Sequence, residues 1–140
     1  MLPVMNDAER LCQRALEARE NAYAPYSRFR VGAALLCEDG TVVLGVNVEN
    51  VSYGLCLCAE RAAIGAAISQ GERRFAAIAI ATASSPPSAP CGMCRQTLAE
   101  FNQEMKVYLV NTSGARVDTT LIELFPGAFD KNQLEDGADR

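Results

Sequence analysis

VGAALLCEDGTVVLGVNV, residues 31–48, contains two apolar runs separated by a short polar connection. The runs cover 31–37 and 42–48, and the connection includes Asp39-Gly40. An Asp-Gly pair between two such runs is a strong signal for a β-hairpin, because its backbone conformation suits the twist of the flanking strands. The sequence therefore predicts that a sheet begins here with an antiparallel pair of strands.

Helical and extended patterns alternate in the chain on both sides of this hairpin. Before it, apolar residues such as Leu11 and Ala15 recur at helical spacing behind Asn6, which can cap a helix. The predicted elements outside the hairpin are helix 7–22, helix 59–69, strand 75–82, helix 91–102, strand 106–110 and a short helix around 119–124. Strands that alternate with helices predict an α/β domain, with helices packed on the faces of the sheet. The hairpin makes that sheet mixed.

Length and composition fit a single folded domain. The chain has 140 residues, of which 49% are hydrophobic and 21% charged, and this is enough apolar material for one core. The final stretch, DKNQLEDGADR, is mostly polar. We therefore expect one domain over residues 1–130 and a flexible C-terminal tail over 131–140.

Charge and hydropathy argue against two classes of partner. Acidic residues outnumber basic ones 17 to 13, with no run of Lys or Arg, so we expect no binding to long nucleic acid. No stretch approaches the roughly 18–20 apolar residues of a membrane helix, so we expect no membrane partner. The first ten residues, MLPVMNDAER, lack a basic leader and an apolar signal core, which predicts a cytoplasmic protein.

The chain has six cysteines and no histidine. Cytoplasmic cysteines stay reduced, so closely spaced ones indicate metal binding or redox chemistry before a disulfide framework. Without histidine, a zinc ion must rest on sulfur and carboxylate ligands, and a Ser-His or Cys-His catalytic pair is excluded. Cys12, on the apolar stripe of the first helix, and Cys37, in a strand, are expected to be buried core thiols.

Two short motifs, each at a predicted helix start, suggest a shared metal. CAE occupies residues 58–60, and PCGMC occupies residues 90–94. The C-x-x-C pair places the sulfurs of Cys91 and Cys94 about one helical turn apart, close enough to bind one ion. Cys58 would supply a third thiolate and leave the fourth tetrahedral position open to water, as in catalytic zinc sites.

The residues after Cys58 suit this chemistry. Three thiolates on zinc leave a formal charge of −1, which two helix N-termini and hydrogen bonds from Arg61 would offset. Glu60 is near the metal but too close to Cys58 in sequence to share its ligation, which makes it a candidate proton carrier. A Cys or His followed by x-Glu, and later by Pro-Cys-x-x-Cys, is the signature of zinc nucleobase deaminases.

Over residues 7–130 the sequence resembles the small, homotetrameric, zinc-dependent cytidine deaminases. Further matching stretches extend beyond the CAER and PCGMCRQ motifs. They are Tyr26-Ser27-Arg28-Phe29, then Asn47-Val48-Glu49-Asn50 ahead of Tyr53, and Leu124-Phe125-Pro126-Gly127-Ala128-Phe129.

The resemblance implies a three-layer cytidine deaminase-like fold, with a five-stranded mixed sheet flanked by helices. The pattern above contains only four strands, so the fifth is expected at 116–119. The resemblance also implies substrate-binding roles. Asn47 and Glu49 match residues that bind the ribose, Phe29 packs near the pyrimidine, and the backbone of Ala59 contacts the base. Tyr53 and Phe129 match residues that complete a neighbouring subunit's site.

The implied reaction is hydrolytic deamination of free cytidine and 2′-deoxycytidine to uridine and 2′-deoxyuridine plus ammonia, in pyrimidine salvage. It implies one Zn²⁺ per chain held by Cys58, Cys91 and Cys94, water activated by that zinc, Glu60 as the proton shuttle, and Arg61 as a hydrogen-bonding partner of the thiolates. The implied assembly is a homotetramer, and the implied partner is a small nucleoside.

Four alternatives remain open at the level of the sequence. A structural zinc knot would add Cys56 to the three other thiolates and close the coordination sphere. A redox protein would use Cys91 and Cys94 alone. A blasticidin-type deaminase shares the zinc motifs but departs at the position of Glu49. Relatives that edit RNA or DNA usually have histidine as the first ligand and a basic surface, and this chain has neither.

Overall fold

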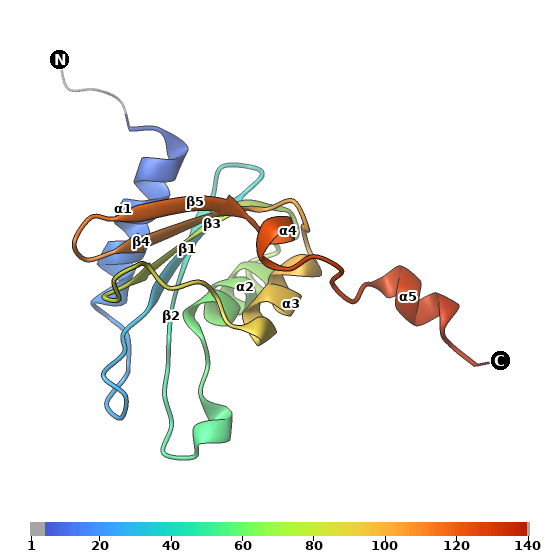
Figure 1. The fold of residues 1–140 in the computed structure, drawn as a ribbon, viewed down its shortest axis with the longest axis horizontal. Helices are drawn as coiled ribbons and strands as arrows, with labels where there is room; N and C mark the ends of the chain where they lie inside the picture. Colours follow the sequence, from blue (N-terminus) through green and yellow to red (C-terminus); the bar gives the residue numbers. More distant parts are fainter. Residues whose placement is uncertain (1–4, 140) are drawn as a thin grey trace.

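The computed structural model describes residues 5–139 and shows a five-stranded mixed sheet between two layers of helices (Figure 1). The strands are β1 (Gly32–Cys37), β2 (Val42–Val46), β3 (Phe75–Thr82), β4 (Lys106–Asn111) and β5 (Arg116–Thr120). The helices are α1 (Asp7–Arg19), α2 (Ala59–Ser69), α3 (Gly92–Ala99), α4 (Leu121–Leu124) and α5 (Lys131–Asp136), with a 3-10 turn at Tyr53–Leu55. The predicted fold class, including the fifth strand, is confirmed.

The order of strands across the sheet is β2-β1-β3-β4-β5. In the predicted hairpin, β1 pairs antiparallel with β2. On its other side, β1 pairs antiparallel with β3. Among the strands that the structure describes, only β3 and β4 pair in parallel, and α3 lies on the connection between them. That crossover brings the start of α3 next to the start of α2 on one face of the sheet (Figure 1).

Alternate residues of β1 face two different cores, as the two-residue period of a strand requires. Leu35 and Cys37 lie in the larger core, beneath α2 and α3. Ala34 and Leu36 lie in the smaller core, beneath α1, together with Cys12. Both Cys12 and Cys37 are buried, which confirms the expectation for these two thiols.

Several element ends differ from the sequence predictions by a few residues, at places where the chain makes hydrogen bonds to other segments. The first helix ends at Arg19 rather than at residue 22, since the Tyr23 N–H donates to the Asn47 carbonyl. β2 ends at Val46 rather than at residue 48, since Val48 pairs with Leu57 and not with β1. The third helix ends at Ala99 rather than at residue 102, although the Asn102 N–H still donates to the Leu98 carbonyl and the Asn102 side chain donates to the Phe75 carbonyl.

The stretch expected to be a flexible tail contains the short helix α5. Asp130 caps it, accepting a 2.9 Å hydrogen bond from the Gln133 N–H. None of its residues is buried, and Figure 1 shows it projecting away from the sheet. Local capping therefore gives this segment helical structure, and its flexibility stays a prediction. Within residues 5–139, no helix is long and apolar enough to cross a membrane.

Candidate metal centre and active-site pocket

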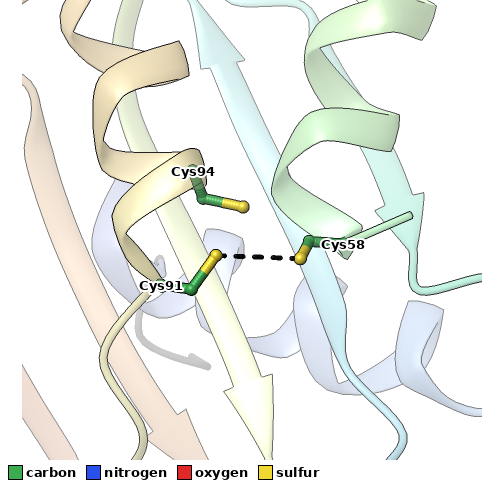
Figure 2. A group of neighbouring side chains, drawn as sticks. All are labelled: Cys58, Cys91 and Cys94. Carbon is green, nitrogen blue, oxygen red and sulfur yellow. Dashed lines mark hydrogen bonds between the residues drawn. The ribbon is translucent and has the colours of Figure 1, made fainter. Parts of the chain in front are cut away.

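The three cysteines of the two motifs converge at the starts of α2 and α3. Their sulfur atoms all lie within 4.8 Å of one another. Figure 2 shows Cys58 on one helix start facing Cys91 and Cys94 on the other, with 3.9 Å between the Sγ atoms of Cys58 and Cys91. A tetrahedral zinc with Zn–S bonds of about 2.3 Å requires sulfur atoms about 3.8 Å apart. The three thiols therefore fit one Zn²⁺.

Backbone geometry at the helix starts directs both sulfurs toward this point. Cys58 and Cys91 are the N-cap residues of α2 and α3, both in extended conformation, and neither side chain caps its own helix. The sulfurs are free to bind a cation while the positive ends of two helices lie beside them. Burial alone would raise the pKa of the Cys91 thiol, but hydrogen bonds from the N–H groups of Cys94 and Met93 help to lower it overall.

Cys94 is fully buried, one turn into α3. Burial, together with the charges of Glu60 and the other two cysteines, raises the pKa of the Cys94 thiol. Three thiols and a carboxyl crowded into one place repel one another when ionised. A divalent cation offsets that repulsion, and thiols must lose their protons to bind it.

Arg61 lies beside the same centre. Its Nη2 is 3.7 Å from the Cys58 sulfur and donates a 3.4 Å hydrogen bond to the Cys56 carbonyl. The contact with the Cys58 sulfur raises the pKa of the Arg61 guanidinium, which keeps its charge in place. The structure therefore places Arg61 against one of the three sulfurs, and its role toward the thiolates stays a prediction.

Glu60 is 5% exposed and lies between Ala59 and Arg61 in the first turn of α2. Burial raises the pKa of the Glu60 carboxyl above its ordinary value, and hydrogen bonds from its own backbone N–H and from Cys94 oppose that shift only in part. A carboxyl with a raised pKa is better matched to accepting and releasing protons near neutral pH.

A pocket of about 300 Å³ opens over these groups. Its volume is at the lower end of the range typical of small-molecule sites. Seven of the residues singled out from the sequence line it: Phe29, Asn47, Glu49, Cys58, Ala59, Glu60 and Cys91. Residues 29, 47 and 49 lie far from residues 58–60 and 91 along the chain, so the tertiary structure joins two groups of candidates into one site.

Tyr53 and Phe129 do not line this pocket. Their side chains are 73% and 55% exposed, and each borders a separate hollow on the surface. The hollow beside Tyr53 adjoins the pocket, since Ser27, Glu49 and Cys56 line both. Their predicted role in a neighbouring subunit's site stays a prediction.

Asn47 and Glu49 both hold the loop that enters β1. The Asn47 amide donates to the Phe29 carbonyl at 2.7 Å and accepts from the Val31 N–H at 2.8 Å. The Glu49 carboxylate accepts from the N–H groups of Tyr26 and Ser27 and from the Ser27 hydroxyl. Each side chain faces the pocket while it fixes one part of the pocket wall.

The loop contains two features that sequence reasoning did not assign. Ser27 lines the pocket, bonds Glu49, and accepts a 3.0 Å hydrogen bond from the Phe29 N–H. Arg28, which lies between Ser27 and Phe29, has a φ of 60°, a left-handed conformation that non-glycine residues rarely adopt.

Thr82, Ser88 and Ala89 also line the pocket. They lie at and after the end of β3, and no motif marks them in the sequence.

Cys56 does not join the three-sulfur group. Its sulfur accepts from the Asn50 N–H at 3.4 Å and lies 3.7 Å from the Asn50 carbonyl, which closes the loop before the 3-10 turn. The geometry thus argues against a closed zinc knot of four thiolates.

Comparison with known proteins agrees with this geometry. Residues 5–110 match the family model described as the cytidine and deoxycytidylate deaminase zinc-binding region. The chain belongs to this family. It is 49% identical over 135 residues to a cytidine deaminase from Sporosarcina psychrophila, an alignment that covers 96% of this chain and 99% of that protein.

Solved structures extend the comparison to the fold. A crystal structure of cytidine deaminase from Burkholderia pseudomallei matches with a TM-score of 0.85 and 48% identity, over 89% of this chain and 100% of that one. A more distant relative is a blasticidin-S deaminase from Bacillus cereus, 31% identical over 76% of this chain and 81% of its own length. Family, fold and sulfur cluster together identify a zinc-dependent hydrolytic deaminase with a site for one Zn²⁺. A redox protein that uses Cys91 and Cys94 alone is inconsistent with this result.

Proposed function

We propose that this chain hydrolyses free cytidine and 2′-deoxycytidine to uridine and 2′-deoxyuridine, releasing ammonia. One observation carries the proposal: the buried Glu60 carboxyl and two of the three clustered cysteines, Cys58 and Cys91, line the same pocket as Asn47 and Glu49. The first group suits a proton-transfer reaction, and the second suits the hydroxyl groups of a ribose. Full-length cytidine deaminase relatives support this substrate class.

The proposed reaction requires one group that moves protons. A zinc ion held by Cys58, Cys91 and Cys94 would supply Lewis-acid activation of a water molecule. Glu60 takes a proton from the attacking water and gives it to ring nitrogen 3, which makes carbon 4 more electrophilic. A C–O bond forms at carbon 4, Glu60 passes the next proton to the amino group, and the C–N bond breaks. Cytidine and water thereby give uridine and ammonia.

The remaining pocket residues are proposed to hold the substrate. Asn47 and Glu49 keep unused hydrogen-bonding capacity after binding the loop, since a carboxylate offers about four lone-pair directions and an amide offers two donors. We assign that capacity to the ribose hydroxyls. Phe29 packs against the pyrimidine, and the Ala59 N–H, which opens α2, donates to the base.

The proposed assembly is a cytoplasmic homotetramer acting in pyrimidine salvage. Large apolar side chains are exposed on the segment that borders the pocket, among them Val51, Tyr53 and Leu55. Contiguous exposed apolar surface is a common mark of a protein interface. Tyr53 and Phe129, which lie outside their own pocket, would then complete the pocket of a neighbouring subunit.

The decisive experiment follows the loss of cytidine ultraviolet absorbance on incubation with the purified, zinc-loaded protein. We expect turnover of cytidine and deoxycytidine, and we expect it to stop when a strong chelator removes the metal. Blasticidin S serves as the competing substrate, because the family also includes a blasticidin-S deaminase. Absence of turnover on both nucleosides by fully zinc-loaded protein would refute the proposal. Turnover of blasticidin S alone would replace it.

A further inference from the structure

Strand β2 approaches the start of α2 unusually closely at Gly45. The residue is buried, and a Cβ atom there would lie 2.3 Å from the Ala59 carbonyl oxygen and 2.5 Å from the Ala63 nitrogen. Both are backbone atoms of α2, which cannot rotate away as a side chain can. Any side chain at position 45 would therefore push the first turn of α2 off the sheet.

That turn carries the chemistry of the site. Cys58 is its N-cap, and Ala59, Glu60 and Arg61 follow directly. The nearest atoms to a Cβ at Gly45 all belong to α2, whereas the other two sulfurs are on α3. A displacement of α2 alone would change the 3.9 Å distance between the Cys58 and Cys91 sulfurs.

We propose that Gly45 is a positioning residue: its missing side chain lets α2 lie against β2 and places Cys58 within zinc-binding distance of Cys91 and Cys94. The spacing between β2 and α2 thus sets the distance from the Cys58 sulfur to the sulfurs of Cys91 and Cys94. This inference depends on the zinc centre and not on the identity of the substrate. Functional sites commonly tolerate errors of only about 0.5 Å in the positions of their groups.

Gly32 on β1 provides a matched control. A Cβ there would lie 2.1 Å from the Ala15 carbonyl oxygen and 2.5 Å from the Arg19 nitrogen, both backbone atoms of α1. The steric situation is thus the same on the opposite face of the sheet. None of the residues that line the pocket or form the sulfur cluster belongs to α1.

The test compares Gly45→Ala and Gly32→Ala in the full-length chain. Zinc retention is measured by competition with a chromogenic chelator. The geometry of the centre is followed by the thiolate-to-metal charge-transfer and ligand-field bands of the cobalt-substituted protein. We expect both variants to melt at lower temperature. Gly45→Ala should retain zinc about 10- to 100-fold less tightly, the loss typical when the support of a metal ligand is removed. Gly32→Ala should retain zinc as the parent does and keep the parent cobalt spectrum.

Three outcomes would overturn the proposal. The first is parental zinc retention and an unchanged cobalt spectrum in Gly45→Ala. The second is equal weakening in both variants, which reports general destabilisation. The third is failure of Gly45→Ala alone to fold, which assigns Gly45 to folding. If both glycine variants fail to fold, Val43→Ile adds one methylene to the same buried contact between β2 and α2. Weaker zinc retention in Val43→Ile supports the proposal, and unchanged retention overturns it.

Discussion

The Glu49 carboxylate accepts hydrogen bonds from both the backbone N–H and the hydroxyl of Ser27. The two residues are 22 positions apart in the chain and both line the pocket. A residue chosen from the sequence for substrate binding therefore also fixes the wall of the pocket. Any change at Glu49 will affect both roles, so a separate probe of the loop contact is needed.

Ser27→Ala isolates that contact. The Ser27 hydroxyl is the main cause that lowers the pKa of the Glu49 carboxyl, so the variant should move this pKa back up toward its ordinary value. Because the folded-state pKa is depressed, the stabilisation is complete above the ordinary carboxyl pKa and is lost as the pH falls through the folded-state value. A carboxyl-detected NMR titration measures the shift. Ser113→Ala, in an exposed turn, is the control, and equal Glu49 pKa values in parent and Ser27→Ala would contradict the assignment.

Glu60→Gln tests the proton carrier. Glutamine keeps the shape and the metal centre but cannot exchange a proton, so kcat should fall by at least about 10²- to 10⁴-fold. Zinc content, measured by atomic absorption, should equal that of the parent. The exposed Glu104→Gln should leave both quantities unchanged. Parental turnover by a zinc-loaded Glu60→Gln protein would remove the proposed role.

Arg61→Gln tests the contact with the sulfur. Loss of the positive charge 3.7 Å from the Cys58 sulfur leaves the thiolates without that compensation, and kcat should fall about 10- to 100-fold. Steady-state kinetics on zinc-loaded protein provide the measurement. Arg74→Gln, at an exposed site, is the matched control. Equal losses in the two variants would indicate a general charge effect instead.

Mixed assemblies test whether sites are shared between subunits. Glu60→Gln and Phe129→Ala should each be defective alone. If Phe129 serves a neighbour's pocket, co-refolded mixtures will contain some sites with both an intact Glu60 and an intact Phe129, and activity will exceed that of either variant. Mixing Glu60→Gln with Cys58→Ala, two defects within one pocket, should restore nothing. Light scattering on the parent checks the tetramer directly, and a monomer of parental activity would end this hypothesis.

Removal of zinc should destabilise the fold as well as stop turnover. The ligands join α2 to α3, and a ligand that binds only the folded state adds about 2.7 kcal/mol of stability at 100 times its dissociation constant. Differential scanning calorimetry should show a lower Tm after chelation and recovery when zinc is added back. An unchanged Tm in demonstrably zinc-free protein would contradict a site that couples the two helices.

The residue pattern predicts neither α5 nor β5, and β5 shows why. Its first three residues are exposed, and it forms the edge of the sheet, so its sequence carries no apolar alternation. It is held by its ladder with β4 and bears a 2.7 Å ion pair between Arg116 and Asp118. Neither backbone pairing nor an ion pair produces a hydrophobic pattern in the sequence. For this reason only the resemblance to a family suggested a fifth strand.

The sequence by itself determined the hairpin at 31–48, the buried strand at 75–82 and the two helix starts that carry the three cysteines. These features are local, since turn chemistry, hydrophobic period and helix capping act within a few residues. Only the tertiary structure decided which distant segments meet. It brought Glu49 to Ser27, left the Cys56 sulfur out of the three-sulfur group, and set α2 against Gly45. Those outcomes depend on packing distances between elements, which no local pattern of residues encodes.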